Sequence, residues 1–370
     1  MHYTLHLTAD CNMNCDYCYV KDTSNTMTSD VTYKVIDNIL AAKQQKAGIA
    51  FFGGEPLLCK DLIRDTIAYA RNFPGETKFY FKITTNGLLL NEEFVEYCKK
   101  ESIYVAISLD GTPEAHNAHR LDKGGRGTYE KVASAAKLLL KHLPNSPVMM
   151  TVNPDTVDYY ADSVSHLFEL GFIYILCALN YAAKWNAKEI NELKSQYKKL
   201  AEFYYENTMA EKKFYLSPFE IKMDSHINNR SYSHERCELG KNQVSIAPDG
   251  TIYPCIEFVG DEQYAIGDVY SGINRSLQQT LFLQNEKEKP GCDICTIRKR
   301  CNHYCACQNK QATGSISDVS PVLCRHEQVL LPIADKLAER LYRKRSELFI
   351  QKHYNDYYPI LSAIEDGVAR

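Results

Sequence analysis

Three cysteines near the N-terminus are the first residues in this 370-residue chain whose type and spacing could do chemistry. Cys11, Cys15 and Cys18 form a C-x3-C-x2-C run directly after the apolar stretch 3–7. Three thiolates in one short loop can hold three irons of a 4Fe–4S cluster and leave the fourth iron open. Structural zinc is the alternative, but it requires a fourth ligand, and the obvious one, His6, lies back in the predicted strand.

A second set of cysteines lies in the last part of the chain, at Cys237, Cys255, Cys292, Cys295, Cys301, Cys305 and Cys324, with Cys307 close after Cys305. Asp249-Gly250 between two alternating apolar runs predicts a β-hairpin, which would bring Cys237 and Cys255 together. The spacing C-x2-C-x5-C-x3-C that follows predicts a metal-bound array. Two zinc-ribbon-like sites are the alternative for this part of the chain, because C-x2-C pairs in general favour zinc.

Composition limits the protein's class. The chain is 45% apolar and 24% charged with a formal net charge of -3, so no basic face for nucleic acid is implied. No apolar run reaches the roughly 18 residues of a membrane span, and the N-terminus has no signal peptide. We therefore expect a cytoplasmic protein without a membrane partner. Thiols stay reduced in that compartment, so the 14 cysteines indicate metal binding or catalysis.

The first half of the chain alternates short apolar runs with longer amphipathic stretches. The predicted strands are 3–7, 49–52, 79–83, 104–107, 148–151 and 172–176. The predicted helices between and after them are 29–46, 60–71, 91–100, 129–142 and 156–170, several of which follow a capping residue at Thr28, Asn91 or Thr128. This alternation predicts parallel strands with right-handed crossovers, and the unusual motifs all fall at the C-terminal strand ends.

Six such units predict the fold class, an α/β partial (β/α)6 barrel with a C-terminal cysteine-rich domain. Residues 188–213 are expected to form one long, exposed helix, and helix returns after Cys324, with a strongly charged stretch at 330–348. The expected domains are a barrel, a helical bridge, a cysteine-rich domain and a C-terminal helical segment, at 1–185, 186–235, 236–328 and 329–370.

The segment from Cys11 to Cys18 resembles the signature of the radical S-adenosylmethionine (SAM) superfamily, with Tyr17 at the aromatic position. Other strand-end motifs resemble the SAM-binding segments of that family. The resemblance implies that Gly53-Gly54-Glu55 binds the methionyl amine, and that Ser108 and Asp110 contact the ribose. It also implies that Arg120, after His116-Asn117, pairs with the methionyl carboxylate, for which a guanidinium is well suited.

The resemblance also implies an oxygen-sensitive enzyme. The open iron would chelate the amine and carboxylate of SAM, and an electron from the reduced cluster would break the S–C5′ bond. The resulting 5′-deoxyadenosyl radical would abstract a hydrogen atom from the substrate, while the protein orients the reactants and excludes water. A reductant such as flavodoxin or ferredoxin would supply the electron.

The C-terminal array resembles the SPASM domain, which carries two auxiliary 4Fe–4S clusters and would bring the total to three. The resemblance implies a distal cluster on Cys292, Cys295, Cys301 and Cys324, and a proximal cluster on Cys237, Cys255 and Cys305. Either Cys307 is the fourth proximal ligand or that iron stays open. The isolated Cys59, Cys98 and Cys177 are expected to be packing residues.

SPASM-type enzymes mostly modify peptides or proteins, and an open proximal iron could bind a substrate thiolate. We therefore predict a maturase that forms thioether crosslinks in a ribosomally made precursor peptide. The barrel starts near Met1, so we expect any leader peptide to bind elsewhere or through a separate recognition protein.

Two alternatives remain at the level of sequence, and other peptide chemistries, such as epimerisation or carbon–carbon crosslinking, also stay open. One is an anaerobic, formylglycine-generating sulfatase maturase, although Ile256 and then Glu257 stand where that family has an Asp after the hairpin's second cysteine. The other is a non-catalytic zinc-binding regulator. No catalytic residue is assigned.

Overall fold

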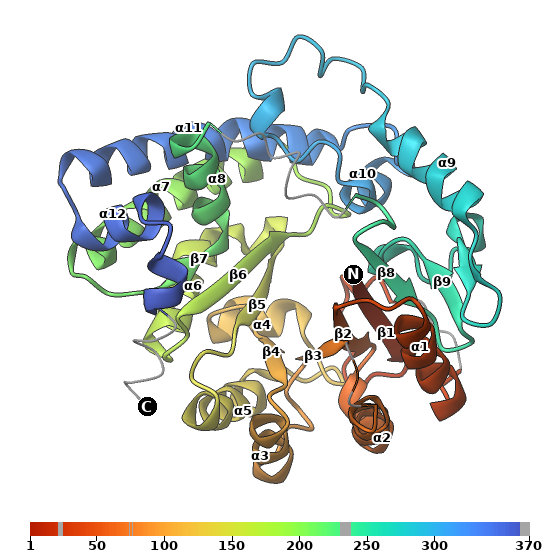
Figure 1. Ribbon diagram of the computed structural model, residues 1–370. Coiled ribbons are helices and arrows are strands. Elements are labelled where there is room, and N and C mark those ends of the chain that lie inside the picture. The colour runs from red at the N-terminus through yellow and green to blue at the C-terminus, as the bar shows by residue number, and fades with distance from the viewer. Residues whose placement is uncertain (21–24, 74, 76, 230–237, 363–370) are drawn as a thin grey trace.

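The computed structural model describes the chain except residues 21–24, 74, 76, 230–237 and 363–370. One open sheet of 11 strands runs through it in the order β11-β10-β9-β8-β1-β2-β3-β4-β5-β6-β7 (Figure 1). Strands β1 to β6 are parallel neighbours in chain order, with bounds His2–Thr8, Lys46–Gly53, Lys78–Thr85, Tyr104–Ser108, Val148–Val152 and Tyr174–Leu179. The predicted partial (β/α)6 barrel is confirmed.

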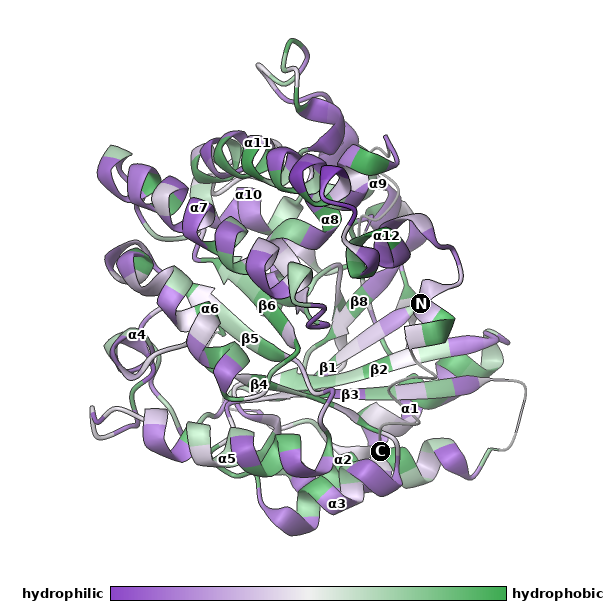
Figure 2. Cartoon of the chain, turned by 90° about the vertical axis from the view of Figure 1, so that its left-hand side faces the viewer, coloured by the Kyte–Doolittle hydropathy of each residue, from purple (hydrophilic) through white to green (hydrophobic). Residues whose placement is uncertain are grey.

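Helices connect these strands and cover the sheet's outer face, with their apolar sides turned toward it (Figure 2). They are α1 (Ser29–Ala41), α2 (Lys60–Arg71), α3 (Glu92–Lys100), α4 (Pro113–His119), α5 (Tyr129–His142) and α6 (Tyr160–Glu169), with 3-10 turns η1 (Pro56–Cys59) and η2 (Pro154–Tyr159). The sheet's side chains form the core beneath them. Leu5, Ile49 and Phe51 are completely buried, as expected for parallel strands covered on both faces.

Some predicted boundaries need correction. The first helix ends at Ala41 and not at residue 46, because Lys46 already begins β2. The stretch 156–170 is divided between η2 and α6, and α4 was not predicted. Asn91 caps α3 by accepting from the Phe94 N–H at 3.0 Å. Thr28 and Thr128 occupy N-cap positions without a side-chain capping bond.

The predicted hairpin is confirmed, and it extends the same sheet. Strands β8 (Gln243–Ile246) and β9 (Thr251–Tyr253) are antiparallel around Asp249-Gly250. Strand β8 pairs in parallel with β1, so the cysteine-rich region is joined directly to the strand that carries the first cysteine loop. Two short strands, β10 (Gly267–Asp268) and β11 (Gly272–Ile273), complete this edge.

Most of the remaining helices lie on the side of β6 and β7, whereas α9 and α10 lie on the side of β8 and β9 (Figure 1). They are α7 (Ala187–Met209), α8 (Ser217–Ile227), α9 (Arg275–Glu286), α10 (Ala306–Thr313), α11 (Pro321–Arg343) and α12 (Glu347–Tyr354), with strand β7 (Tyr215–Leu216) and 3-10 turns η4 (Ile256–Phe258), η5 (Glu262–Tyr264) and η6 (Arg298–Arg300). The prediction that the long helix is exposed was wrong, because α7 buries Leu193, Tyr197 and Leu200. None of the described helices is both long and apolar enough to cross a membrane.

Candidate active site

The loop that leaves β1 brings three thiols together. Cys11 and Cys15 are half-buried, and the Met13 N–H donates to Cys11 Sγ at 3.4 Å. Burial raises the pKa of Cys11, and burial with repulsion from the neighbouring Cys11 and Cys18 thiolates raises the pKa of Cys15 to about 11. The thiolates therefore need a cation to stabilise them, as bound metal does. Three close cysteines fit the donor set of a 4Fe–4S cluster with one open iron.

Asn86 is a site residue that the sequence analysis missed. It lies at the end of β3, in the Thr84-Thr85-Asn86-Gly87 segment, and its Nδ2 donates to Asn12 Oδ1 at 2.7 Å and to Cys11 Sγ at 3.5 Å. The available signal was its place at a C-terminal strand end. A donor to a thiolate tunes the reduction potential of any cluster that the thiolate holds.

The Gly-Gly-Glu segment at the end of β2 supports the cysteine loop. A Cβ on Gly54 would lie 2.2 Å from the Asp10 carbonyl oxygen, and one on Gly53, whose φ is +130°, would lie 2.2 Å from the Thr8 carbonyl oxygen. Glu55 is fully buried, and its carboxylate accepts hydrogen bonds from Thr85 Oγ1 and from the Asn86 and Leu57 N–H groups. The glycines are thus required for close backbone approach, and the Glu55 carboxylate joins the ends of β2 and β3.

Tyr17, Asp110 and Arg120 form a buried network beside the first cysteine loop. Asp110 accepts hydrogen bonds from Tyr17 Oη at 2.6 Å, from Arg120 Nε at 2.8 Å and from the Thr151 N–H at 2.9 Å. Burial disfavours the Arg120 charge, but the adjacent Asp110 carboxylate outweighs it and raises the pKa of Arg120. Ser108 is half-buried at the end of β4. Asp110 therefore binds the signature tyrosine and the predicted carboxylate-binding arginine together.

Two histidines of α4 hold this network in place. His116 Nδ1 accepts from the Asp110 N–H at 3.3 Å, and its Nε2 contacts Thr128 Oγ1 at 2.9 Å. Burial lowers the pKa of His116 to about 4, so the ring is neutral at pH 7. His119 lies between Asp16 of the cysteine loop and Asp155 of η2, at 2.9 and 3.1 Å.

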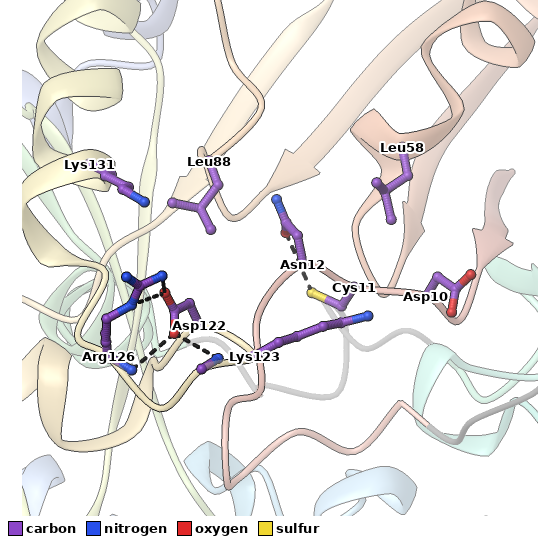
Figure 3. A pocket seen from close by; sticks show the side chains of 10 residues that line it. Asp10, Cys11, Asn12, Leu58, Leu88, Asp122, Lys123, Arg126 and Lys131 are labelled. Carbon is purple, nitrogen blue, oxygen red and sulfur yellow. Dashed lines mark hydrogen bonds and ion pairs between the residues drawn. The ribbon is translucent and has the colours of Figure 1, made fainter.

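A cavity of about 520 Å³ opens beside Cys11 (Figure 3). Leu58 and Leu88 form its apolar edges, and Lys123 and Arg126 lie on the opposite wall. The full lining is Asp10, Cys11, Asn12, Leu58, Leu88, Asp122, Lys123, Gly124, Arg126 and Lys131. Cys11 is its one predicted site residue, and none of the residues predicted to contact SAM lines this cavity.

The four cysteines predicted to hold the distal cluster influence one another electrostatically. Cys292 lies within electrostatic reach of Cys295 and Cys324, and Cys301 within reach of Cys324. Burial raises the pKa of Cys292, Cys301 and Cys324. Four thiols from two loops and the first turn of α11 are therefore gathered in one place.

The proximal group consists of Cys255, Cys305 and Cys307 among the described residues. The Sγ atoms of Cys305 and Cys307 are 3.3 Å apart, and Cys307 also hydrogen-bonds with Cys255. Cys237 falls outside the described residues. Tyr19 lies within electrostatic reach of Cys18 and Cys255, so the first loop and the proximal group are neighbours.

Glu257, on η4, lies next to the proximal group, where its side chain accepts a hydrogen bond from Gln311 Nε2. Burial raises the pKa of Glu257 to about 7. Glu257 stands one position later along the chain than the Asp that follows the hairpin's second cysteine in sulfatase maturases.

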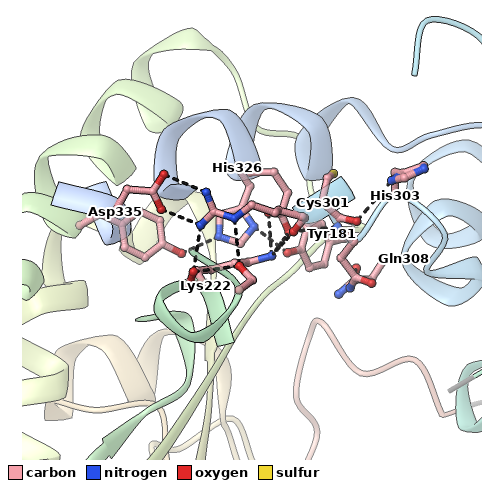
Figure 4. Close-up of polar contacts among 12 residues, drawn as sticks. Tyr181, Lys222, Cys301, His303, Gln308, His326 and Asp335 are labelled. Carbon is pink, nitrogen blue, oxygen red and sulfur yellow. Dashed lines mark hydrogen bonds and ion pairs between the residues drawn. The ribbon is translucent and has the colours of Figure 1, made fainter. Parts of the chain in front are cut away.

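Buried polar contacts fix the distal group to the helices (Figure 4). Lys222 of α8 pairs with Glu327 of α11 at 2.8 Å, with both side chains almost fully buried. Arg300, next to Cys301, forms a bidentate pair with Asp335 at 2.6 and 2.8 Å. The cysteine-bearing loop is thereby attached to α8 and α11 through charged groups.

A neutral histidine fills the space beside these pairs. His326 hydrogen-bonds through Nδ1 with the Tyr181 hydroxyl at 2.9 Å and through Nε2 with the Tyr197 hydroxyl at 2.7 Å. Burial lowers the pKa of His326 to about 3. The start of α11, which carries Cys324, is therefore fixed to α7 and to the segment after β6.

The other described cysteines, Cys59, Cys98 and Cys177, lie outside these three groups, and Cys98 is fully buried. Within the described part of the chain, no set of three or more Cys, His, Asp or Glu side chains is arranged to hold a single metal ion. The first-loop, distal and proximal groups are therefore identified by the closeness of their thiols to one another.

Residues 5–167 match the family model described as the Radical SAM superfamily. The chain belongs to this superfamily. A cysteine-type anaerobic sulfatase-maturating enzyme of Clostridium novyi (strain NT) is 25% identical over 277 residues, which cover 70% of this chain and 74% of that enzyme. The radical SAM assignment makes the chain an enzyme and excludes the non-catalytic zinc-binding regulator.

Solved structures agree with the fold. Native anSMEcpe with bound AdoMet has a TM-score of 0.81 at 20% identity, covering 93% of this chain and 99% of that one. The same enzyme is also known with AdoMet and the Cp18Cys peptide. Streptococcus suis SuiB bound to precursor peptide SuiA has a TM-score of 0.60 at 15% identity, covering 87% and 75%.

These comparisons place this radical SAM enzyme with the SPASM-type enzymes that modify peptides or proteins. The family implies SAM and a 4Fe–4S cluster, which the three thiols of the first loop fit. The named relatives favour the sulfatase-maturating alternative over the thioether-forming reaction predicted from the sequence.

Proposed function

We propose that this radical SAM enzyme oxidises a cysteine or serine side chain of a peptide or protein substrate to an aldehyde, as formylglycine-generating enzymes do. The observation that carries the proposal is the position of Cys307. Cys307 adjoins Cys255 and Cys305, and with Cys237, the further proximal ligand that the family resemblance implies, it would make four thiols for the proximal cluster. Four protein ligands leave no iron for a substrate thiolate, which the thioether mechanism requires.

The protein's own residues perform two tasks at the first cluster in this proposal. Cys11, Cys15 and Cys18 hold the cluster that binds SAM, and bound SAM supplies the radical that removes hydrogen from the substrate carbon. Arg120, kept charged by Asp110, offers its guanidinium to the methionyl carboxylate.

The second and third groups of thiols are proposed to hold auxiliary clusters. Cys292, Cys295, Cys301 and Cys324 would hold the distal one, which gives three clusters in all. Tyr19 lies near both Cys18 of the first loop and Cys255 of the proximal group, which supports a role for the proximal cluster in accepting the electron that the substrate loses.

Mass spectrometry of peptides treated with the anaerobically reconstituted enzyme, SAM and reductant tests the proposal. A cysteine peptide is expected to exchange its sulfur for a carbonyl oxygen from water, with release of 5′-deoxyadenosine. Loss of hydrogen with the sulfur retained in a crosslink would instead establish the thioether reaction and refute ours.

Iron analysis tests the ligand set separately. Cys307→Ala is expected to lower the iron content and to change the spectroscopic signature of one cluster only. Cys59→Ala, outside the three groups, is the matched control and should keep all its iron. Unchanged iron and spectra in Cys307→Ala would remove Cys307 from the ligand set.

A further inference from the structure

We propose that the groove between α7 and α11 binds an acidic amphipathic helix of a partner polypeptide. The two helices pack against each other on the side of the molecule seen in Figure 2, and the groove has a volume of about 610 Å³. Its lining is Ile190, Lys194, Lys198, Ala201, Glu202, Arg325, Gln328, Val329, Pro332, Ile333, Lys336, Leu337 and Arg340. The proposal concerns binding and stands independently of the reaction proposed above.

The floor of the groove is an aliphatic stripe. Val329, Ile333 and Leu337 are spaced four residues apart on α11, and Ile190 and Ala201 face them from α7. Val329, Ile333 and Ala201 are partly exposed, although each could be buried by a covering helix. Side chains at this spacing form one continuous face, which is the surface that the apolar side of an amphipathic helix contacts.

The rim of the groove is strongly cationic. Lys194 and Lys198 line it from α7, and Lys336 lines it from α11, and these three have no ion-pair partner among the described residues. The single acidic residue in the lining, Glu202, is already neutralised by Arg340 through two contacts of 2.6 and 2.9 Å.

The positive charge continues along α11 in both directions. Arg325 lines the groove near the start of the helix. A second hollow that adjoins the groove is lined by Lys336, Glu339, Arg340, Arg343 and Lys344. Glu339 pairs there with Arg343 at 3.2 Å, so Lys344 extends the positive charge at this end of the helix. The whole chain carries a net charge of -3, so this concentration is a local feature and not a reflection of overall composition. Charge complementarity therefore selects an acidic occupant.

The dimensions suit a helix. The lining on α11 extends from Arg325 to Arg340, which at a rise of about 1.5 Å per residue corresponds to roughly 22 Å. Pro332 has no N–H for the Gln328 carbonyl, so that oxygen lacks its usual helical donor within the groove's wall. An occupant of about four turns would span the groove.

Other occupants fit less well. A second copy of the chain that docked through the same groove would bring the cationic rim against itself and be repelled. Single-stranded nucleic acid is held largely by stacking on aromatic side chains, and the lining residues include none. An acidic helix satisfies both the rim and the floor.

Fluorescence anisotropy with the full-length reconstituted enzyme tests the proposal. The probe is a fluorescein-labelled peptide with leucines at helical i, i+3 and i+4 spacing and glutamates elsewhere, and the comparison peptide has lysines in place of the glutamates. The acidic peptide is expected to bind and the basic one not to bind. Raising the salt concentration should weaken binding, because exposed charges are screened.

Matched charge reversals locate the binding site. Lys194→Glu with Lys198→Glu is expected to weaken binding of the acidic peptide about tenfold or more, because each reversal replaces an attraction to the peptide's glutamates with a repulsion. Lys100→Glu with Lys137→Glu, both exposed on α3 and α5, should leave the affinity unchanged. Ile333→Gln tests the floor and should also weaken binding.

Three results would overturn the proposal. The first is equal affinity for the acidic and basic peptides, and the second is equal loss of affinity in the two double variants. The third is binding of phosphatidylglycerol vesicles or single-stranded RNA, but not of the peptide, in a manner that the Lys194 and Lys198 reversals abolish. Release of 5′-deoxyadenosine by each variant verifies that the protein is folded.

Discussion

Replacing Asp110 by asparagine is predicted to destabilise the protein strongly. Asparagine keeps the shape of the side chain and can still accept from the Thr151 N–H. It removes the negative charge that balances Arg120, and the two side chains are only 2% and 10% exposed. Removing one partner of a buried ion pair leaves an uncompensated charge and costs about 3–5 kcal/mol of unfolding free energy.

A second substitution separates charge from packing. Asp110→Asn with Arg120→Met removes both charges, and buried pairs can often be replaced by neutral side chains at little cost. The double variant should therefore recover most of the stability that the single variant loses. Because Arg120 is also the proposed carboxylate ligand, this stable double variant should release little or no 5′-deoxyadenosine.

Urea unfolding under anaerobic conditions, followed by circular dichroism, measures these differences. Asp122→Asn is the matched control, because Asp122 pairs with Arg126, whose side chain is 80% exposed, and its loss should change little. The reasoning is refuted if Asp110→Asn costs less than about 1 kcal/mol, or if the double variant is no more stable than the single one.

Three further predictions concern the same half of the molecule. Asn86→Leu removes a donor to Cys11 Sγ and should lower the reduction potential of the first cluster, as an EPR-monitored redox titration would reveal. The pKa of His116 is lowered to about 4 from 6.5, so its stabilising effect is complete above pH 6.5 and lost as the pH falls toward 4. Between pH 6.5 and 4, the unfolding free energy measured by urea titration should fall by up to about 3 kcal/mol less in His116→Gln than in the wild type. Gly54→Ala places a Cβ 2.2 Å from a backbone oxygen of the cysteine loop. It should lower the unfolding free energy by about 1–3 kcal/mol and reduce the iron content. Gly75→Ala is the control, because its Cβ would meet nothing closer than 3.8 Å.

Outcomes that would contradict these three predictions are equally specific. An unchanged potential in Asn86→Leu would mean that its contact with the thiol has no electronic effect. Parallel pH profiles for the wild type and His116→Gln would assign the acid sensitivity to other groups. Full iron content and stability in Gly54→Ala would mean that the loop can move aside without cost.

The order of the strands and the place of the chemistry followed from local patterns. Apolar runs rich in Ile, Val and Phe alternate with amphipathic stretches, and this periodicity depends only on neighbouring residues. Parallel pairing then requires the strand ends to meet at one edge, which is why the Cys11 loop, Glu55 and Asp110 could be expected together. The hairpin was predictable because Asp249-Gly250 is a local turn signal.

Contacts between distant segments could not be predicted in this way. The sequence left the role of Cys307 open, and the pairing of β8 with β1 and the contact of Asn86 with Cys11 went unpredicted. Each depends on segments that are far apart in the chain, and no periodicity records their meeting. The expectation of an exposed α7 failed for the same reason, because α11 covers one side of it.

The sequence by itself determined the thiols, their spacing and the strand ends that carry them, since these are properties of residue type and local order. Only the tertiary structure decided that Asp110 joins Tyr17 to Arg120, that Cys307 adjoins Cys255, and that two charged helices enclose a cationic groove. Those features arise from packing, where burial and charge act between residues that the chain alone keeps apart.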